Sequence, residues 1–343
     1  MKVKAEKTMS GVRHLLLRSA AGALLLALSW PAAAQNCQTA SDMDDAARTA
    51  ITAAGQKFFD MASKGDVTSM QQNSIPSLAA NFGSISAIVK DRQPELAGAQ
   101  ATVKSMFLLE ADGTAPLPNA EFYCGVFGKN GQTANSAIFN LSNLPPGKYG
   151  VVILTVASPK GKTHFSVIVQ QEGNDWKLGG LYIKPADIAG HDGDWYLSKA
   201  REYKSKGQMH DAWLYYLQAA DMLSPLSFMS TQATDKMYEE FQGARPADFP
   251  AADKPADLSA GGAAYKLTRM SPAQVGNDLD LLVRYQVADA SNANQSYQSN
   301  MAVMKALVTK YPELRDAFSG IEARAVDSSG HDYGTLLGMK DIK

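Results

Sequence analysis

Residues 148–184 read KYGVVILTVASPKGKTHFSVIVQQEGNDWKLGGLYIK, and this stretch decides the fold class. Its β-branched and aromatic residues predict three strands, over 148–158, 162–172 and 175–184. The turn signals between these strands, Pro159-Lys160-Gly161 and Gly173-Asn174, are only a few residues long. Because parallel strands need long crossover connections, the short turns favour antiparallel neighbours.

Helices and further strands are expected before this stretch. Apolar residues recur at helical spacing over 43–64 and 77–92, and Asp66 is placed to cap a short helix between them. Three more segments have the composition of strands: 101–110, 120–128 and 135–141. The pattern predicts an α+β fold, in which helices pack on a single antiparallel sheet over 100–184.

Two short motifs lie at the ends of this region. Residues 58–66, FFDMASKGD, form the exit of the first predicted helix, and residues 173–183 carry GNDWKL followed by LYI in the closing strand. With the order of elements, these motifs make residues 43–184 resemble the NTF2-like, or cystatin-like, superfamily. That resemblance implies a domain over 35–185 in which a curved sheet wraps a helix and leaves a cone-shaped pocket. Some members of the superfamily are enzymes, and many only bind or assemble.

Residues 194–225 resemble the helix hairpin of tetratricopeptide repeats. Small residues allow two helices to approach closely, at Ala200, Ala212 and Ala219. Gly207 permits the turn between the helices, and aromatic residues such as Tyr216 fill the space between them. About three such units are needed for a continuous repeat core, so this single hairpin is expected to pack on its neighbours. A third helix is expected over 227–242, which completes a helical region over 186–243.

The end of the chain is expected to form a separate small module. Residues 244–264 are rich in Ala, Pro, Asp and Gly, which is typical of a linker. The following elements predict a β-α-β-β module over 265–343: a strand at 279–287, a helix at 297–311, and strands at 320–327 and 333–340. About 80 residues bury too little surface for high stability, so the module is expected to dock on the rest of the chain.

The first 34 residues have the three-part order of a secretory signal peptide. Residues 1–18 hold five Lys and Arg against one Glu, an apolar run of 11 residues covers 20–30, and small residues follow over 31–34. A membrane-spanning helix needs ~20 apolar residues, which disfavours the alternative of a permanent anchor. We therefore predict cleavage after Ala34 and a periplasmic or secreted protein.

Cleavage would leave 28 basic and 33 acidic side chains, a net charge of −5. A mildly acidic protein has no electrostatic reason to seek nucleic acid or an anionic membrane, so neither is expected as a partner. No later stretch approaches the length of a transmembrane segment.

The sequence contains only two cysteines, Cys37 and Cys124. In an oxidising compartment such a pair favours a disulfide. Its loop of 87 residues would contribute ~4–5 kcal/mol in the chain-entropy model. Two separate thiols stay open as the alternative. A lipid anchor on Cys37 is disfavoured, because Gln35 and Asn36 precede it where small residues would be needed.

The motifs of common enzyme classes are missing. The sequence has no G-x-S-x-G, no G-x-G-x-x-G, no Walker loop, no C-x-x-C and no H-E-x-x-H. Serine hydrolases, nucleotide-dependent enzymes, thioredoxin-like redox enzymes and zincins therefore lose support, and no cofactor is expected.

Aromatic residues and one histidine are the candidates for a pocket in the predicted cone: Tyr123, His164, Trp176 and Tyr182. Aromatic rings are common in ligand sites and equally common in sheet cores. His164 is predicted to share a strand face with Ser166. If that face lines the pocket, His164 could act as an acid–base group, because the pKa of a histidine lies near neutrality. The alternative is a solvent-facing strand residue. Asp66 and Glu121 are further acidic candidates near the mouth, although capping or solvation explains both.

Four potential metal ligands lie within eight residues: Asp187, His191, Asp192 and Asp194. Oxygen ligands in a loop would suit Ca²⁺, but the alternate carboxylates of a calcium loop are absent. Asp194 also has an ordinary interpretation as the cap of a helix that begins at Trp195. We therefore predict no metal.

Taken together, the patterns predict an exported, non-enzymatic protein that binds a partner protein or a small apolar ligand. A small hydrolase or isomerase with His164 as the acid–base group is the first alternative. A structural role in the cell envelope is the second.

Overall fold

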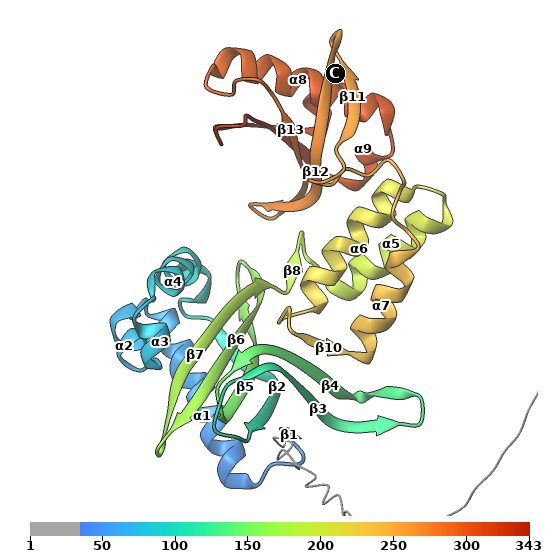
Figure 1. Ribbon diagram of the computed structural model, residues 1–343. Coiled ribbons are helices and arrows are strands. Elements are labelled where there is room, and N and C mark those ends of the chain that lie inside the picture. The colour runs from blue at the N-terminus through green and yellow to red at the C-terminus, as the bar shows by residue number, and fades with distance from the viewer. Residues whose placement is uncertain (1–34) are drawn as a thin grey trace, which may run out of the picture. The chain divides into compact units, whose positions relative to one another are not determined.

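A computed structural model describes residues 35–343 of the chain (Figure 1), so the predicted signal peptide lies outside the described residues. Residues 35–343 form one compact unit. It combines helices with mainly antiparallel sheets, which confirms the α+β class. No helix within residues 35–343 has the length and apolar character required to cross a bilayer.

The first sheet contains the strands that the opening stretch of sequence predicts. Its order is β1-β2-β5-β6-β7, and all neighbours are antiparallel. The strands are β1 Gln35–Thr39, β2 Gln100–Ala111, β5 Gly147–Ser158, β6 Gly161–Glu172 and β7 Asp175–Pro185. The predicted turns join β5 to β6 and β6 to β7, so these predictions are confirmed. β1 was not predicted, because its pairing partner β2 lies about 70 residues further along the chain.

Two of the predicted strands leave this sheet. β3 (Leu117–Gly128) and β4 (Gly131–Leu144) form a second sheet with β10 (Met229–Thr231), in the order β10-β4-β3. The prediction of a single layer over 100–184 is therefore wrong. The reason is that apolar side chains of the two sheets pack against each other: the rings of Phe107 on β2 and Phe139 on β4 have centroids 5.0 Å apart. The superfamily's curved sheet stays a prediction.

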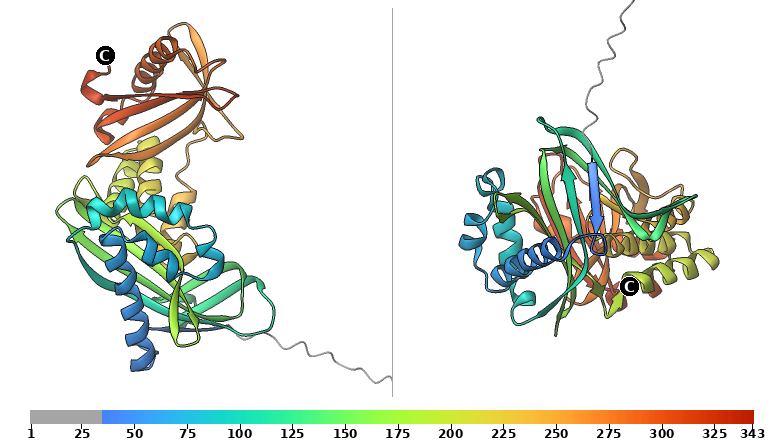
Figure 2. Two further views of the ribbon diagram at one scale, coloured as in Figure 1. Left: turned by 90° about the vertical axis from the view of Figure 1, so that its left-hand side faces the viewer. Right: turned by 90° about the horizontal axis from the view of Figure 1, so that it is seen from below.

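Helices cover one face of the first sheet (Figure 2). They are α1 Asp45–Ser63, α2 Val67–Gln72, α3 Pro76–Ala79 and α4 Gly83–Leu96. On α1, Phe59 packs edge-on against Phe165 of β6, at a centroid distance of 5.5 Å. Asp66 caps α2 as predicted. The helix predicted over 77–92 is instead divided into α3 and α4, and Pro94 lies inside α4 rather than past its end.

The predicted helical hairpin follows the first sheet. A two-residue ladder, β8 Asp187–Ile188 with β9 His191–Asp192, leads into α5 Gly193–Ser205 and α6 Met209–Leu223, and α7 Gln232–Gln242 is the predicted third helix. Gly207 has a φ of 77° at the turn, which explains the glycine. The helix α5 begins at Gly193 and Asp192 caps it, so the assignment of Asp194 as the cap is wrong.

The C-terminal part is a larger sheet than predicted, in the order β11-β12-β13-β14-β15. Its elements are β11 Ala256–Ala260, β12 Ala263–Val275, β13 Asp278–Gln286, α8 Ala293–Lys310, α9 Leu314–Ala317, β14 Gly320–Val326, β15 Asp332–Gly338 and a 3₁₀ turn Met339–Asp341. β13 and β14 are parallel, and α8 connects them. β11 lies inside the predicted linker over 244–264, so that segment is partly a strand. β12 was missed because Pro272 and several polar residues interrupt its pattern.

One apolar core joins the helical hairpin to this sheet. Tyr215 of α6 belongs to it, and its hydroxyl donates a hydrogen bond of 2.5 Å to the carbonyl oxygen of Ala317 in α9. The expectation that the C-terminal part docks on the rest of the chain is confirmed. The division of the chain into domains stays a prediction.

Candidate functional site

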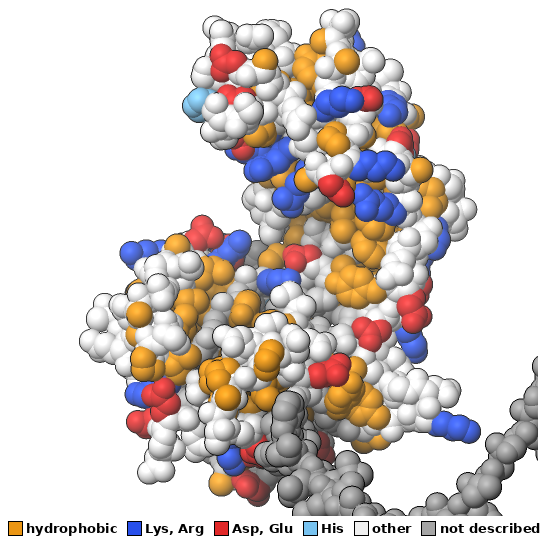
Figure 3. All heavy atoms as spheres, in the orientation of Figure 1, with side chains coloured by type: hydrophobic (Ala, Val, Ile, Leu, Met, Phe, Trp, Pro, Cys, Tyr) orange, Lys and Arg blue, Asp and Glu red, His pale blue; other side chains and the backbone are white. Residues whose placement is uncertain are grey.

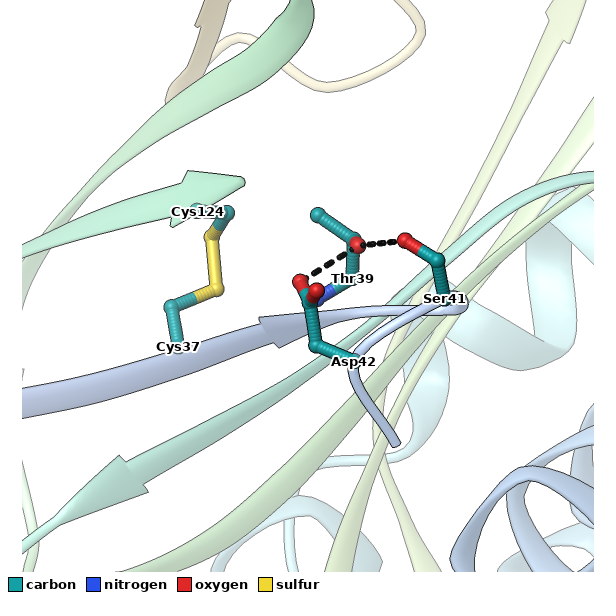
Figure 4. Close-up of a disulfide and its surroundings, with 5 residues drawn as sticks. All are labelled: Cys37, Thr39, Ser41, Asp42 and Cys124. Carbon is teal, nitrogen blue, oxygen red and sulfur yellow. Dashed lines mark hydrogen bonds between the residues drawn. A yellow bond between two sulfur atoms is a disulfide. The ribbon is translucent and has the colours of Figure 1, made fainter. Parts of the chain in front are cut away.

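A disulfide between Cys37 and Cys124 joins β1 to β3 (Figure 4). The two Cα atoms are 4.9 Å apart, across a separation of 87 residues in the sequence. Cys124 is fully buried. The predicted pairing is therefore confirmed, and it attaches the N-terminal strand to both sheets: to the first by its ladder with β2, and to the second by a covalent bond.

A tight polar turn follows β1 (Figure 4). The Thr39 hydroxyl donates to Oδ2 of Asp42 at 2.6 Å, and the Thr39 backbone N–H donates to the same oxygen at 3.0 Å. These bonds lower the pKa of Asp42 below its usual value. The Ser41 and Thr39 hydroxyl oxygens are 2.9 Å apart. The network holds residues 39–42 as a defined rim next to the disulfide.

Gly125, directly after the bonded cysteine, allows β3 to approach this rim. Its φ is +82°, which favours glycine. A Cβ atom there would collide with the carbonyl oxygen of Asn135 and would lie 3.1 Å from Cγ2 of Thr39. The close approach of these three segments is therefore possible only without a side chain at position 125.

A cavity of about 730 Å³ lies beside this rim, between the two sheets and the segment after α6. Its size falls within the range of ligand sites, ~300–1,000 Å³. Its apolar walls include Met106, Phe107, Val126, Ile153, Leu223, Pro225 and Met229. Polar groups come from the Thr39–Asp42 rim and from Lys104, Ser105, Asn135 and Ser136. The cavity thus combines an apolar body with a few polar groups, of which Lys104 is the only lysine or arginine.

Lys104 connects this cavity to His164. The Nζ atom of Lys104 lies 3.4 Å from Nε2 of His164, whose side chain is buried at 7% exposure. Within residues 35–343, no carboxylate lies within ion-pair distance of Lys104; burial lowers its pKa, and the more distant charge of Asp194 acts in the opposite direction. Because an ammonium group only donates hydrogen bonds, Nε2 accepts and Nδ1 carries the imidazole proton.

Burial, together with the positive charges of Lys104 and Lys184, lowers the pKa of His164 to about 4. The imidazole is therefore neutral at pH 7. Its Nδ1 atom and the hydroxyl of Ser166, which is fully buried, have no hydrogen-bond partner in the described part of the chain. The predicted shared face of His164 and Ser166 is confirmed by their place in β6, whereas the solvent-facing alternative for His164 is wrong.

Of the other predicted pocket residues, only Tyr182 shares the sheet face of His164. Tyr123 is 54% exposed on β3, where its ring packs against Phe127. Trp176 packs against the core on the helix-covered face of the first sheet. Tyr182 lies on the opposite face, which is the face of His164, because it pairs directly with Ser166; its ring is edge-on to Phe228. The reason is the alternation of side chains across a strand together with the departure of β3 from the sheet.

Three of the four potential metal ligands over 187–194 have other contacts. Asp187 accepts a hydrogen bond from the Lys162 backbone N–H at 3.0 Å, and Asp192 caps α5. His191 stacks on Trp195 with ring centroids 3.6 Å apart. Across residues 35–343, no group of three or more His, Cys, Asp or Glu side chains is arranged to hold a metal ion.

Hydrophobic side chains are also visible over α6 and α7 (Figure 3). A hollow of about 520 Å³ lies there, and its lining includes Leu217, Phe228, Tyr238 and Phe241. Tyr238 is 41% exposed. Among the described residues, the only charged groups that line this hollow are Lys184 and Asp221, which pair with each other at 2.8 Å.

Lys104 and the cavity it lines were not predicted. Lys104 lies in β2, whose later residues are apolar, and a single lysine in a strand is only a weak indication of a binding site. Comparison with protein families, with curated proteins and with solved structures finds no match for this chain. The cavity beside the disulfide is the site with the most features of a ligand pocket.

Proposed function

We propose that this protein is an exported, non-enzymatic binding protein whose cavity accepts a small apolar molecule that bears an acidic group. The observation that carries the proposal is the lining of the 730 Å³ cavity: apolar walls with Lys104 as the one cation and no carboxylate paired with it.

The physical argument has two parts. Apolar ligand surface gains about 25 cal/mol per Å² when it leaves water for apolar walls such as Phe107 and Ile153. A charged group in a site of low polarity is stable only with a partner, so the unpaired ammonium of Lys104 favours an anionic head group. The disulfide and the Thr39–Asp42 rim support a preformed wall, which reduces the entropy lost on binding.

The surroundings of His164 favour binding over acid–base catalysis. A general base works best with a pKa near the operating pH, and the pKa of about 4 makes His164 a weak base at neutrality. Its neighbour is an ammonium group rather than the carboxylate that would orient and strengthen a base. His164 then acts as the acceptor that positions Lys104.

The disulfide and the signal-type N-terminus support an oxidising compartment, either the periplasm or the extracellular space. The cleavage site after Ala34 belongs to the same proposal.

A ligand panel tests this function. The oxidised protein is titrated calorimetrically with straight-chain fatty acids, with the matching alcohols and with the matching alkylamines. The comparison separates the contribution of the apolar chain to affinity from that of the head group. We expect the fatty acids to bind at least tenfold more tightly than the alcohols and the amines to bind least. Lys104→Met should abolish the preference for the acid, whereas Lys162→Met, at an exposed lysine outside the cavity, should keep it. Equal affinity for acid and alcohol, or an unchanged preference in Lys104→Met, would refute the proposal.

A further inference from the structure

The C-terminal sheet has an unpaired edge at β11. This strand pairs with β12 on one side, and no backbone hydrogen bond from elsewhere in residues 35–343 reaches its other side. In an antiparallel pair, alternate residues direct their N–H and C=O groups away from the partner strand. β11 therefore presents free backbone donors and acceptors that a further strand could pair with.

A groove of about 670 Å³ runs between this edge and α8. The strand side is formed by Asp257, Leu258, Ser259, Ala260 and Gly261, and the helix side by Ala302, Lys305, Ala306, Thr309 and Lys310. Ala302 and Ala306 are one helical turn apart and face the strand with small side chains. The space beside β11 stays open because these positions carry no larger residue.

The charges around the groove favour an acidic occupant. Lys305 and Lys310 are exposed on the helix side. The single carboxylate of the lining, Asp257, is neutralised by Lys266 at 2.5 Å. Lys310 lies 3.6 Å from Asp248, whereas Lys305 forms no ion pair with any residue in 35–343.

We propose that this groove binds an acidic peptide in extended conformation, which adds a strand beside β11. The peptide backbone would pair with the free edge, its apolar side chains would pack on Ala302 and Ala306, and its carboxylates would meet Lys305 and Lys310. The five residues of β11 offer an edge about 17 Å long, at ~3.4 Å per residue. A second copy of this edge is a poor occupant, because the same lysines would face each other.

Fluorescence polarisation with labelled peptides tests the proposal. A peptide of repeated Val-Thr-Glu-Thr units places valine and glutamate alternately on one face of a strand. We expect it to bind at least tenfold more tightly than a Val-Thr-Lys-Thr peptide, and more tightly than a Val-Thr-Glu-Thr peptide whose alternate amides are N-methylated. Equal binding of the acidic and basic peptides, or of the methylated and unmethylated ones, would overturn the proposal.

Variants locate the site. Lys305→Glu should weaken the acidic peptide at least tenfold and strengthen the basic one, whereas Lys340→Glu, at an exposed lysine outside the groove, should change neither. Ala306→Trp should block both peptides by filling the groove, with an unchanged melting curve as the control for folding. Unaltered peptide affinities in Lys305→Glu and Ala306→Trp would refute this location. Lys104→Met should leave peptide binding intact, so failure here is distinguishable from failure of the cavity proposal.

Discussion

Asp211 of α6 is a carboxylic acid with no exposed surface and no hydrogen-bond partner for either oxygen within residues 35–343. Burial, together with the charges of Glu313 and Asp316, raises its pKa to about 7. Its aromatic neighbours Tyr203 and Tyr215 supply no positive charge. The adjacent His210 contacts Asp248 instead, with its Nε2 atom 2.9 Å from Oδ1.

Asp211 should make the fold less stable as the pH rises from about 4 to about 7. The pKa of Asp211 in the folded state lies above the unfolded value of 3.8. Between these two values the folded state binds more protons than the unfolded state, so the free energy of unfolding decreases as the pH rises. Asp211→Asn should remove this slope and stabilise the protein at pH 8, by at most ~4 kcal/mol at 1.36 kcal/mol per pKa unit. Urea unfolding at pH 5 and pH 8 measures both effects. Asp60→Asn, at an exposed helical position, is the control, and equal slopes in Asp211→Asn and the unaltered protein would contradict the prediction.

Among the elements, the pair α5 and α6 depends on aromatic packing. Tyr216 is 1% exposed, and its ring lies 5.9 Å from that of Phe241 on α7. Tyr196 on α5 is equally buried, and its hydroxyl donates to the carbonyl oxygen of Ile188 at 3.1 Å. The small residues Ala200 and Ala212 are fully buried, as the sequence predicted. Filled space between the rings therefore stabilises the helices, in addition to the ion pair of Arg201 on α5 with Glu240 on α7 at 2.8 Å.

Tyr216→Ala should destabilise the protein by ~3–5 kcal/mol, because the removed ring leaves a cavity in a packed core. Tyr238→Ala on the neighbouring helix α7 is the matched control, since Tyr238 is 41% exposed and should cost under ~1 kcal/mol. Chemical denaturation of the two variants provides the comparison. A similar loss of stability in both would show that Tyr216 is not a core residue.

For the whole molecule, the disulfide is the covalent link between the two N-terminal sheets. It closes a loop of 87 residues that contains α1 to α4 and β2. Without the bond, the ladder of β1 with β2 and the Gln35 side chain, which accepts from the Glu121 backbone N–H at 2.6 Å, would still hold the strand in place. The folded topology is therefore expected to survive reduction at a lower stability.

The double variant Cys37→Ala with Cys124→Ala should lose ~4–5 kcal/mol of unfolding free energy in the chain-entropy model. Its cavity should also bind a fatty acid more weakly, because β1 and the Thr39–Asp42 rim lose their attachment to β3. Denaturation and titration under oxidising conditions measure the two losses. Unchanged stability would mean that the unfolded chain is not restricted by the bond, and unchanged affinity would mean that the rim is ordered without it.

Local chemistry in the sequence determined the extents of most elements. The Gly and Pro turns around residues 148–184 delimit β5, β6 and β7, and the helical spacing of apolar residues delimits α1, because both signals act over a few neighbouring residues. The period of two along β6 also placed His164 and Ser166 on one face.

Only the tertiary structure decided which strands pair and where the site lies. β10 pairs with β4 across about 90 residues, and β1 pairs with β2 across about 70. Such contacts depend on how distant apolar faces pack, which no local pattern encodes. The same holds for Lys104 and His164, 60 residues apart in the sequence and 3.4 Å apart in space. The sequence by itself thus determined the secondary-structure elements and the faces that they bury, whereas long-range packing decided which faces meet and left a cavity between the two sheets.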